Sequence, residues 1–491
     1  MASPTANNAD NADDQAEAPA NERPLDANEF GLLFSKFLKD VVNSARPLEG
    51  TLTSAIAEKM GVEPTGLPVV SRTFPSFELA NLQLAFEGLV ERYGDFETIG
   101  VAGYGRMYRD FTEVISDADF KVGPVDYRSV NIGTGKDLTC IAAAVLIFKF
   151  GPEKTPVAVW IRGGDPDDHM TPAHIDVITS TTDTAEAFFT ELETLMLARN
   201  VFRGKIVSWQ SHAFASGVGP LRFHDPRKVS KDQVILPDGL LELIERQVSG
   251  IAAQRDFLIA HNQHLKRGVL LYGPPGTGKT HVINYLLGQL PDFTVVLVSG
   301  TAVERISEAC AIARKLHPSL VIVEDVDLIA EDRGARGGSH PLLLQLLNEL
   351  DGVDNDVDVA FVLTTNQVEI LERALAARPG RVDLAVEVPL PDKAGRRRLF
   401  HLYTEGLGLS EKDINAFSDR AEGVTASFAK EATRRAVLIA GERGSDTVET
   451  RDFTQSLDEL LSQKDELTRR LLGARMAGEY ASDERKPGNY V

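Results

Sequence analysis

A short apolar segment followed by a glycine-rich octapeptide constrains this chain more than any other feature. The apolar residues Val269 to Tyr272 predict a buried strand, and residues 280–287 predict a helix. The octapeptide that joins them matches the P-loop pattern G-x-x-x-x-G-K-[ST] at every fixed position. It consists of Gly273, Pro274, Pro275, Gly276, Thr277, Gly278, Lys279 and Thr280. A strand, a glycine-rich turn and a helix in this order predict a nucleoside triphosphate site.

The composition of the octapeptide has a physical reason. Glycines let the backbone turn its N–H groups inward around phosphate oxygens, and the N-terminus of the following helix favours the same negative charge. Lys279 would then hold the β- and γ-phosphates, and the hydroxyl of Thr280 would coordinate Mg²⁺.

Length and charge narrow the class of protein. A chain of 491 residues is long enough for two or three domains. Its 52 Lys and Arg against 72 Asp and Glu give a net charge of −20, which argues against nucleic acid as a partner. The two cysteines, Cys140 and Cys310, indicate no disulfide framework, and no apolar run reaches membrane-spanning length. These features predict a cytoplasmic protein without a membrane partner.

The N-terminal part reads as a tail followed by one domain. Residues 1–28 predict a disordered acidic tail, residues 29–215 an α+β domain and residues 216–232 a linker. The domain starts with an amphipathic helix over 29–44, which either packs on the domain or binds a partner. Further helices are expected over 77–93 and 184–198, and strands over 108–114, 138–150, 157–161, 174–178 and 201–209.

One cluster in this domain contains metal-ligand residue types: Asp165, Asp167, Asp168, His169 and His174. Two glycines precede it and Pro166 lies within it, so an acidic turn between strands is the alternative to a metal site. Nothing else in the domain indicates a chemistry.

A second apolar segment lies downstream of the P-loop. Four β-forming residues, 320–323, are followed directly by Glu324 and Asp325. Such a strand places its acids at the carboxyl edge of a parallel sheet, where open α/β sheets bind their ligands. This is the Walker B position.

With these motifs the chain resembles the AAA family of ATPases over about residues 230–475. Further segments carry the resemblance: residues 346–352, residues 361–366 and residues 377–383. The resemblance implies an α/β fold, a P-loop NTPase module with a parallel sheet flanked by helices over 233–391 and a helical lid over 392–475. It also implies ATP and Mg²⁺ as cofactors and a homo-oligomer, in this family a hexamer.

The resemblance also assigns residues to roles. Val234 and Ile235 would lie against the adenine, and Asn366 would orient the attacking water. Arg378 and Arg381 would be arginine fingers, because the developing charge on the γ-phosphoryl group needs a planar cation.

Two departures from the family pattern matter. The family usually has Asp before Glu at the end of Walker B, whereas here Glu324 takes the Mg²⁺-coordinating place and Asp325 the water-activating one. We expect hydrolysis, whether fast or slow, rather than an inactive site. The segment 299–306 passes into a helix without the aromatic pore loop of many members. Both departures resemble the mitochondrial AAA chaperone that moves a folded iron–sulfur protein across a membrane.

Three later segments leave alternatives open. Residues 331–339, with Arg333 and Arg336, fit either a pore-lining loop or a solvated one. Residues 423–430 occupy the place of the family's second sensor and contain no arginine. The flexible tail 476–491 ends in Tyr490 and Val491, which resembles the ending with which actinobacterial proteasome-activating ATPases dock onto the 20S core; an incidental tail is the alternative.

These observations together predict an ATP-hydrolysing, ring-forming remodeller or chaperone that recruits a protein client through its N-terminal domain. The alternatives are a slow nucleotide-gated scaffold and a proteasome-associated ATPase.

Overall fold

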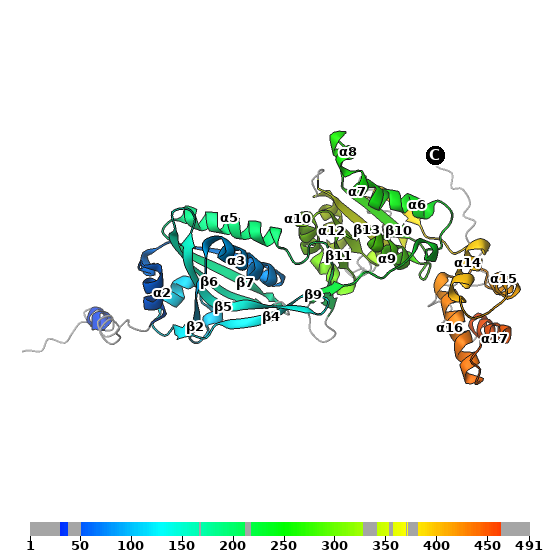
Figure 1. Ribbon diagram of the computed structural model, residues 1–491, viewed down its shortest axis with the longest axis horizontal. Helices are drawn as coiled ribbons and strands as arrows, with labels where there is room; N and C mark the ends of the chain where they lie inside the picture. The colour runs from blue at the N-terminus through cyan, green and yellow to red at the C-terminus, as the bar shows by residue number, and fades with distance from the viewer. Residues whose placement is uncertain are drawn as a thin grey trace, which may run out of the picture.

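The structure is a computed structural model that describes residues 30–37, 51–165, 168–211, 218–327, 341–352, 357–369, 371 and 382–462. Within these residues the chain forms an N-terminal lobe, a P-loop sheet with its helices, and a helical lid (Figure 1). Residues 30–37 are helical, and five of their apolar side chains are exposed. The rest of the helix expected over 29–44 lies outside the described residues, as do the tails 1–28 and 476–491.

The N-terminal lobe, residues 51–205, is built on an antiparallel sheet. Among the described residues this sheet has seven strands in the order β1-β7-β6-β5-β2-β3, with β4 paired to β5. The strands are β1 (Val69–Phe74), β2 (Glu97–Ala102), β3 (Lys121–Gly123), β4 (Asp126–Gly133), β5 (Lys136–Phe150), β6 (Thr155–Asp165) and β7 (Asp168–Thr179). Helices α3 (Leu79–Tyr93) and α5 (Thr182–Ala198) cover one face, and α2 (Leu52–Met60) and α4 (Phe111–Ser116) cover the other.

Strand β5 shows why this sheet reads as a continuous apolar run in the sequence. Its residues Leu146, Phe148 and Phe150 pack under α3 and α5. The alternate residues Val145 and Ile147 pack toward α2 and α4. Because both faces of the strand are covered, successive side chains are all apolar instead of alternating with polar ones.

One expected strand is a helix. Residues 108–114 were predicted to be extended, but residues Arg106–Tyr108 form a 3₁₀ turn and α4 starts at Phe111. Asp110 caps this helix, because its side chain accepts from the backbone N–H of Glu113 while the Glu113 side chain accepts from the N–H of Asp110. This capping box stabilises the helix start and outweighs the β propensity of the segment.

The P-loop sheet is parallel over most of its width. Among the described residues it has seven strands in the order β14-β10-β13-β12-β11-β8-β9, of which only β9 is antiparallel to its neighbour. The strands are β8 (Ile206–Ser211), β9 (Val218–His224), β10 (Arg267–Tyr272), β11 (Thr294–Val298), β12 (Ser319–Val323), β13 (Val359–Thr365) and β14 (Leu384–Glu387).

Helices cover both faces of this sheet. Helices α10 (Ile306–Lys315) and α12 (Pro341–Asp351) pack on one face. Helices α6 (Leu240–Glu245) and α9 (Lys279–Gln289) pack on the other. Beyond α6 the chain continues through a π-helical turn, Arg246–Gly250, into the short helices α7 (Ile251–Ala253) and α8 (Arg255–Ala260).

The pairing of β8 and β9 corrects the predicted boundary between the lobes. We assigned residues up to 215 to the N-terminal domain and residues 216–232 to a linker. Instead, β8 pairs in parallel with β11, and β9 pairs with β8. The hairpin therefore extends the edge of the P-loop sheet. A strand pattern alone does not say which sheet a strand joins, and the unpaired edge of β11 offers backbone partners close by.

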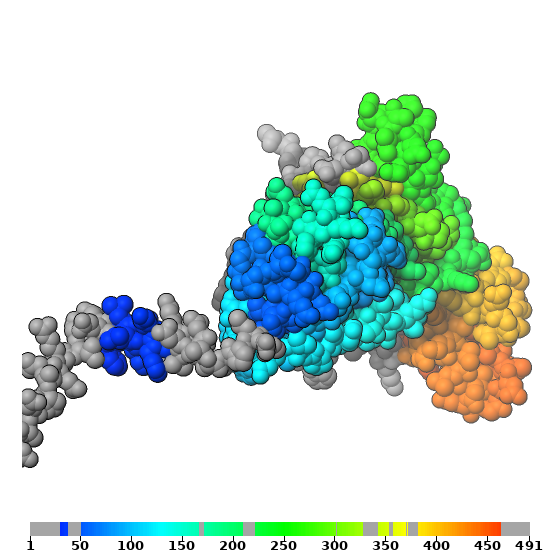
Figure 2. Space-filling model, turned by 60° about the vertical axis from the view of Figure 1, so that its left-hand side comes forward, coloured from blue at the N-terminus to red at the C-terminus, as the bar shows by residue number. Residues whose placement is uncertain are grey.

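Over the described residues 382–462, the lid has four helices: α14 (Lys393–Tyr403), α15 (Glu411–Arg420), α16 (Ala426–Glu442) and α17 (Thr450–Leu461). They share a core of buried side chains that includes Phe400, Phe417 and Phe453. The space-filling view shows the lid as a separate block beside the body of the molecule (Figure 2).

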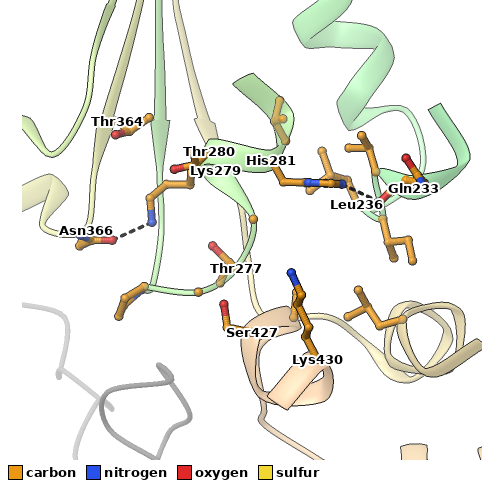
Figure 3. A pocket seen from close by; sticks show the side chains of 18 of the residues that line it. Gln233, Leu236, Thr277, Lys279, Thr280, His281, Thr364, Asn366, Ser427 and Lys430 are labelled. Carbon is orange, nitrogen blue, oxygen red and sulfur yellow. Dashed lines mark hydrogen bonds between the residues drawn. The ribbon is translucent and has the colours of Figure 1, made fainter. Parts of the chain in front are cut away.

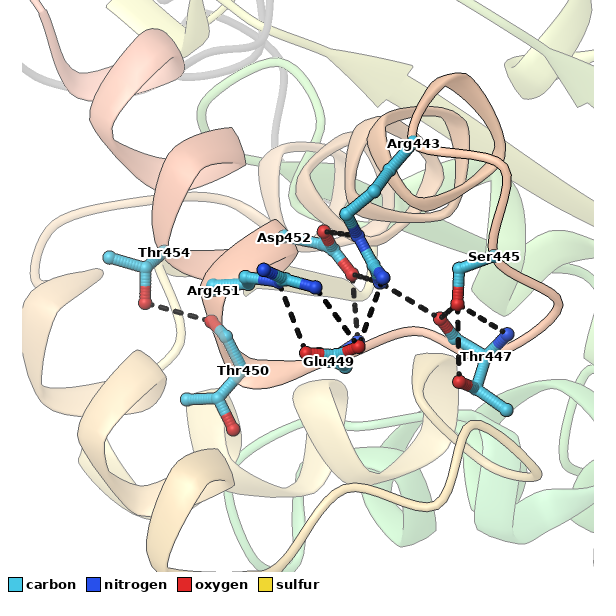
Figure 4. Close-up of polar contacts among 8 residues, drawn as sticks. All are labelled: Arg443, Ser445, Thr447, Glu449, Thr450, Arg451, Asp452 and Thr454. Atoms are coloured by element: carbon cyan, nitrogen blue, oxygen red, sulfur yellow. Dashed lines mark hydrogen bonds and ion pairs between the residues drawn. The ribbon is translucent and has the colours of Figure 1, made fainter.

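The turn between α16 and α17 is fixed by charge. Arg443 donates to Asp452 at 2.8 Å and lies 3.0 Å from Glu449, while the N–H of Glu449 donates to Asp452 at 2.8 Å (Figure 4). The hydrogen bond from Arg443 holds the pKa of Asp452 below its ordinary value. The lid therefore has its own hydrophobic core and its own network of ion pairs at the turn between α16 and α17, so it can move as one unit.

Candidate functional site

The phosphate-binding loop takes the backbone path that its glycines permit. It runs from the end of β10 to Gly278, which caps α9. Gly273, Gly276 and Gly278 have φ angles of 144°, 77° and 113°, which L side chains rarely adopt. At Gly273 a Cβ atom would lie 2.3 Å from the carbonyl oxygen of Val388. The glycines are therefore required by the path of the loop.

Lys279 lies at the centre of the site. Its ammonium group donates to the carbonyl oxygens of Gly273 at 2.8 Å and Pro274 at 3.0 Å and to Oδ1 of Asn366 at 2.7 Å (Figure 3). The residue is 7% exposed. Burial lowers the pKa of Lys279, while the charges of Asp325 and Asp327 oppose that shift. A cation at this position is ready to exchange neutral oxygens for phosphate oxygens.

Thr280 and Glu324 meet beside the loop. The hydroxyl of Thr280 donates to Oε1 of Glu324 at 2.9 Å. Glu324 directly follows β12, and its backbone N–H donates to Val298 of the neighbouring strand β11 at 3.0 Å. A hydroxyl and a carboxylate at this spacing form the kind of oxygen pair that Mg²⁺ prefers.

Asp325 and Asn366 meet at the ends of the central strands β12 and β13. Nδ2 of Asn366 donates to Oδ1 of Asp325 at 3.2 Å. Asp325 has a φ of 52°, in the left-handed region, and its N–H donates to the hydroxyl of Thr364 at 3.0 Å. A non-glycine residue in this region is uncommon and marks a site where the surrounding structure fixes the backbone.

Lys279, Thr280, Asp325 and Asn366 line one cavity of about 470 Å³ between the P-loop sheet and the lid. Such a volume is typical of small-molecule sites. The side of the cavity away from the acids is apolar, and Val234, Ile235 and Leu236 form part of it, with Leu399 and Tyr403 of α14. The expected adenine-binding residues thus lie on the same cavity as the phosphate loop.

Sequence reasoning missed His281 and Gln233, which close the far end of the cavity. His281, the residue after the octapeptide, contacts the carbonyl oxygen of Gln233 through Nε2 at 3.1 Å (Figure 3). This contact ties the start of α9 to the segment that carries Val234. The pattern of the octapeptide ends at Thr280, so it gives no signal for this residue.

The lid contributes two further groups that the sequence did not reveal. The backbone N–H of Ser427, at the start of α16, donates to the carbonyl oxygen of Gly276 at 3.1 Å, which joins the lid to the P-loop. One turn later Lys430 lines the cavity and points into it (Figure 3). We noted that residues 423–430 contain no arginine, but the last residue of that segment supplies a cation to the site. Its position became visible only when α16 and the P-loop were placed together.

Several predicted site residues lie outside the described residues. These are the two candidate arginine fingers Arg378 and Arg381, the loop 331–339 and the C-terminal pair Tyr490 and Val491.

The acidic cluster of the N-terminal lobe is only partly described. Asp165 forms an ion pair with Arg128 at 3.2 Å, and Nδ1 of His174 contacts the hydroxyl of Thr73 at 3.2 Å. Within the described parts of the chain, no group of three or more His, Cys, Asp and Glu side chains could hold a metal ion. Asp167 and the side chains of residues 168–170 fall outside them.

None of the helices that the structure describes is both long and apolar enough to cross a membrane.

The comparison with protein families gives one match, to the ATPase family associated with various cellular activities (AAA), over residues 269–390. This range begins within β10 and ends after β14, so it contains the P-loop, both acids and Asn366.

Among its relatives, the chain is 34% identical over 208 residues to the proteasome-activating nucleotidase of Methanoculleus marisnigri, which covers 40% of this chain and 50% of that protein. It is 32% identical over 212 residues to the ATP-dependent zinc metalloprotease FtsH 1 of Sphaerobacter thermophilus, or 40% of this chain and 32% of that protein. With FtsH 3 of the same organism the identity is 30% over 271 residues, 54% of that protein. The chain thus spans about half, or less, of the length of these relatives.

Proposed function

We propose, from the match of residues 269–390 to the AAA ATPase family, that the chain is a Mg²⁺-dependent ATPase that works as a homo-oligomeric ring and remodels a protein client. The observation that carries the proposal is the convergence of Lys279, Thr280, Asp325 and Asn366 on one cavity, with Glu324 hydrogen-bonded to Thr280 beside it. A cation, an oxygen pair, an acid and an amide at one sheet edge are the groups that phosphoryl transfer to water requires.

In this proposal the P-loop and Lys279 bind the phosphates of ATP, and Lys279 exchanges its contacts with Gly273 and Pro274 for phosphate oxygens. Thr280 and Glu324 would hold Mg²⁺, and their hydroxyl–carboxylate pair fits a hard cation. Bound Mg²⁺ would neutralise charge on the transferring group. Val234 and Ile235 would contact the adenine ring, and Lys430 of the lid would add a second cation beside the nucleotide.

Asp325 takes the role of general base. Its carboxylate is oriented by the Asn366 amide, and its backbone by Thr364. It would accept a proton from the attacking water while Asn366 keeps that water in line. Asp is one methylene shorter than the Glu usual at this position, so the left-handed backbone at Asp325 is a feature that can set where the shorter side chain points.

The oligomer is proposed from the similarity to the AAA family, in which arginine fingers act between the subunits of a ring. Arg378 and Arg381 are the candidates, and in a ring each would act on the site of the neighbouring subunit. An arginine supplied in trans is a common way to complete a phosphoryl-transfer site. A hexamer is the assembly expected of this family.

The N-terminal lobe is proposed to hold the client because it is coupled directly to the ATPase part. Phe77 of the lobe makes an edge contact with Trp209 of β8, with ring centroids 6.5 Å apart. Lys315, at the end of α10, lies 3.8 Å from Glu78 of the lobe. A change in α10 would thus reach the lobe through packed side chains and one ion pair.

The second candidate, a slow nucleotide-gated scaffold, draws support from the segment after β11. Residues Gly300–Arg305 form a 3₁₀ turn, and Ala302 and Val303 are 2% and 4% exposed within the core. They present no aromatic side chain that could grip an unfolded chain. Client stimulation of turnover separates the candidates, because a remodeller should accelerate with client and a scaffold should not.

The capture experiment uses the Asp325→Asn variant, which should bind ATP but turn over slowly. A protein retained by this variant in ATP and released in ADP would be the client of a remodeller. Retention that does not depend on the nucleotide would contradict nucleotide-gated action of either kind.

Docking to a 20S core is proposed from the similarity to proteins named proteasome-activating nucleotidase, with Tyr490 and Val491 as the candidate contact residues. Deleting Tyr490 and Val491 should abolish co-migration with a cognate core in ATP and leave turnover unchanged. If the intact protein never co-migrates with that core, the docking proposal is wrong. The cytoplasm is the proposed location, since it would hold the nucleotide, the core and the client.

A further inference from the structure

A buried acid just behind the catalytic edge, Asp327, has so far been described only as a charge near Lys279. Asp327 is 3% exposed and is not among the residues that line the nucleotide cavity. Burying a carboxylate is costly unless it is hydrogen-bonded, so its partners indicate what it does. Both of its hydrogen-bond partners given by the structure lie at the end of β13.

Oδ1 of Asp327 accepts from the hydroxyl of Thr365 at 2.9 Å and from the backbone N–H of Asn366 at 3.3 Å. The hydroxyl of Thr365 in turn accepts from the N–H of Gln367 at 3.0 Å. Asp327 therefore fixes the turn in which the chain leaves β13, and Asn366 is the first residue of that turn.

A second contact links the same two strand ends in the opposite direction. The N–H of Asp325 donates to the hydroxyl of Thr364. The end of β12 thus holds Asn366 through Asp327, while the end of β13 holds Asp325 through Thr364. Since Asn366 contacts both Lys279 and Asp325, a shift of its backbone would separate the acid, the amide and the cation.

We propose that Asp327 is a positioning residue for ATP hydrolysis, which acts through Thr365 and the backbone of Asn366 to hold the Asn366 amide between Lys279 and Asp325. This inference rests on the proposed ATPase function. It assigns Asp327 a role in turnover and none in nucleotide binding.

The first test is turnover and nucleotide affinity of the full chain with Asp327→Ala. Because a displacement of about 1 Å can cost a factor on the order of 100 in rate, kcat should fall roughly 10- to 100-fold. The Kd for a fluorescent ATP analogue should stay within about twofold, since the cavity wall is unchanged. Two conservative variants should keep most of the wild-type kcat: Asp327→Asn, because it retains an acceptor oxygen, and Thr365→Ser, because it retains the hydroxyl.

A double-mutant cycle separates positioning from general destabilisation. If Asp327 acts through Asn366, Asp327→Ala should lower kcat by less than about twofold in an Asn366→Ala background. Equal losses in both backgrounds would overturn the proposal. Thr365→Val tests the same link with little change in volume. Its matched control is Thr433→Val in α16, where a buried hydroxyl donates to Ala429 at 3.0 Å far from this turn.

Hydrogen exchange gives a readout that does not depend on turnover. Asp327→Ala should accelerate exchange in the peptide that contains the N–H groups of Asn366 and Gln367, and Thr433→Val should not. Unchanged exchange in Asp327→Ala would overturn the positioning role. If the wild-type chain hydrolyses no ATP while exchange responds as expected, the proposed ATPase function fails and the structural link from Asp327 to Asn366 stands.

Discussion

The N-terminal sheet and the P-loop sheet each contain a buried ion pair, and they differ in the polar groups that the P-loop sheet also gathers at one edge. In the N-terminal sheet Arg162 lies 3.1 Å from Asp176, which is buried between covered faces and also accepts from the N–H of Phe111. In the P-loop sheet Glu324, Asp325 and Asn366 lie beyond the ends of β12 and β13, and Asp325 and Asn366 line an open cavity. One set of charges is sealed inside the lobe, and the other is available to a ligand.

Strand direction explains the difference. Neighbouring antiparallel strands end at opposite edges, so the polar residues that follow them are dispersed. Parallel strands all end at one edge, and helix N-termini reach the same edge. The P-loop sheet therefore gathers a cation, two acids and an amide from segments far apart in the sequence. The N-terminal sheet has both of its faces covered by helices and forms the core of its lobe instead.

The largest expected effect comes from removing the cation of the site, Lys279. Lys279→Ala should abolish measurable ATP binding at micromolar protein, because it removes the cation at the centre of the phosphate loop. Calorimetric titration with ATP measures this directly. Lys149→Ala, an exposed lysine of β5 in the other sheet, is the matched control and should bind as wild type does. Unchanged affinity of Lys279→Ala would refute the phosphate site.

Arg381→Ala tests whether a neighbouring subunit contributes an arginine to the nucleotide site at the edge of the P-loop sheet. Nucleotide affinity should remain nearly intact while kcat falls by a factor on the order of 10³, as for other arginine fingers. Mixing Arg381→Ala with Lys279→Ala subunits should give turnover above either parent. Absence of recovery in proven mixed rings would count against action in trans.

Lys430→Ala asks whether the lid belongs to the site. Loss of one cation from the cavity wall should weaken ATP binding roughly 3- to 10-fold, with a smaller change for adenosine, which carries no phosphate. Arg434→Ala is the control, because Arg434 is paired with Glu431 on an exposed face of the same helix. Equal losses for ATP and adenosine would show that Lys430 does not act on phosphates.

The smallest effect concerns the lid alone. Arg443 lowers the pKa of Asp452 in the folded state, so this pair stabilises the lid above the unfolded pKa of Asp452, and the contribution is lost as the pH falls through the folded pKa. The difference in Tm between wild type and Arg443→Gln should therefore be largest near neutral pH and shrink below about pH 4. A difference that grows on acidification would contradict the assignment.

The sequence predicted the centre of the site better than its periphery. The octapeptide and the strand before Glu324 are local patterns, and their physics requires a particular turn and a particular sheet edge. Lys430 and His281 could not be found this way, because their place depends on packing between segments that are distant in sequence. The bond from Ser427 to Gly276 is one such contact.

The fold shows the same limit. Apolar runs identified β5 and β12, but they did not reveal that β8 would pair with β11, since the pairing of an edge strand depends on which neighbouring strand it meets. The capping box of Asp110 and Glu113 fits a D-x-x-E pattern in the sequence, but our prediction for residues 108–114 rested on their β-forming side chains alone.

The most direct test of the central claim compares binding and turnover in the Asp325→Asn variant of the full chain, with Mg²⁺ present. If the acid at the end of β12 is the general base, ATP affinity should stay within about threefold of wild type while phosphate release falls by a factor on the order of 100 or more. If Asp325→Asn, at equal occupancy with ATP, released phosphate as fast as the wild type, Asp325 would not be the general base.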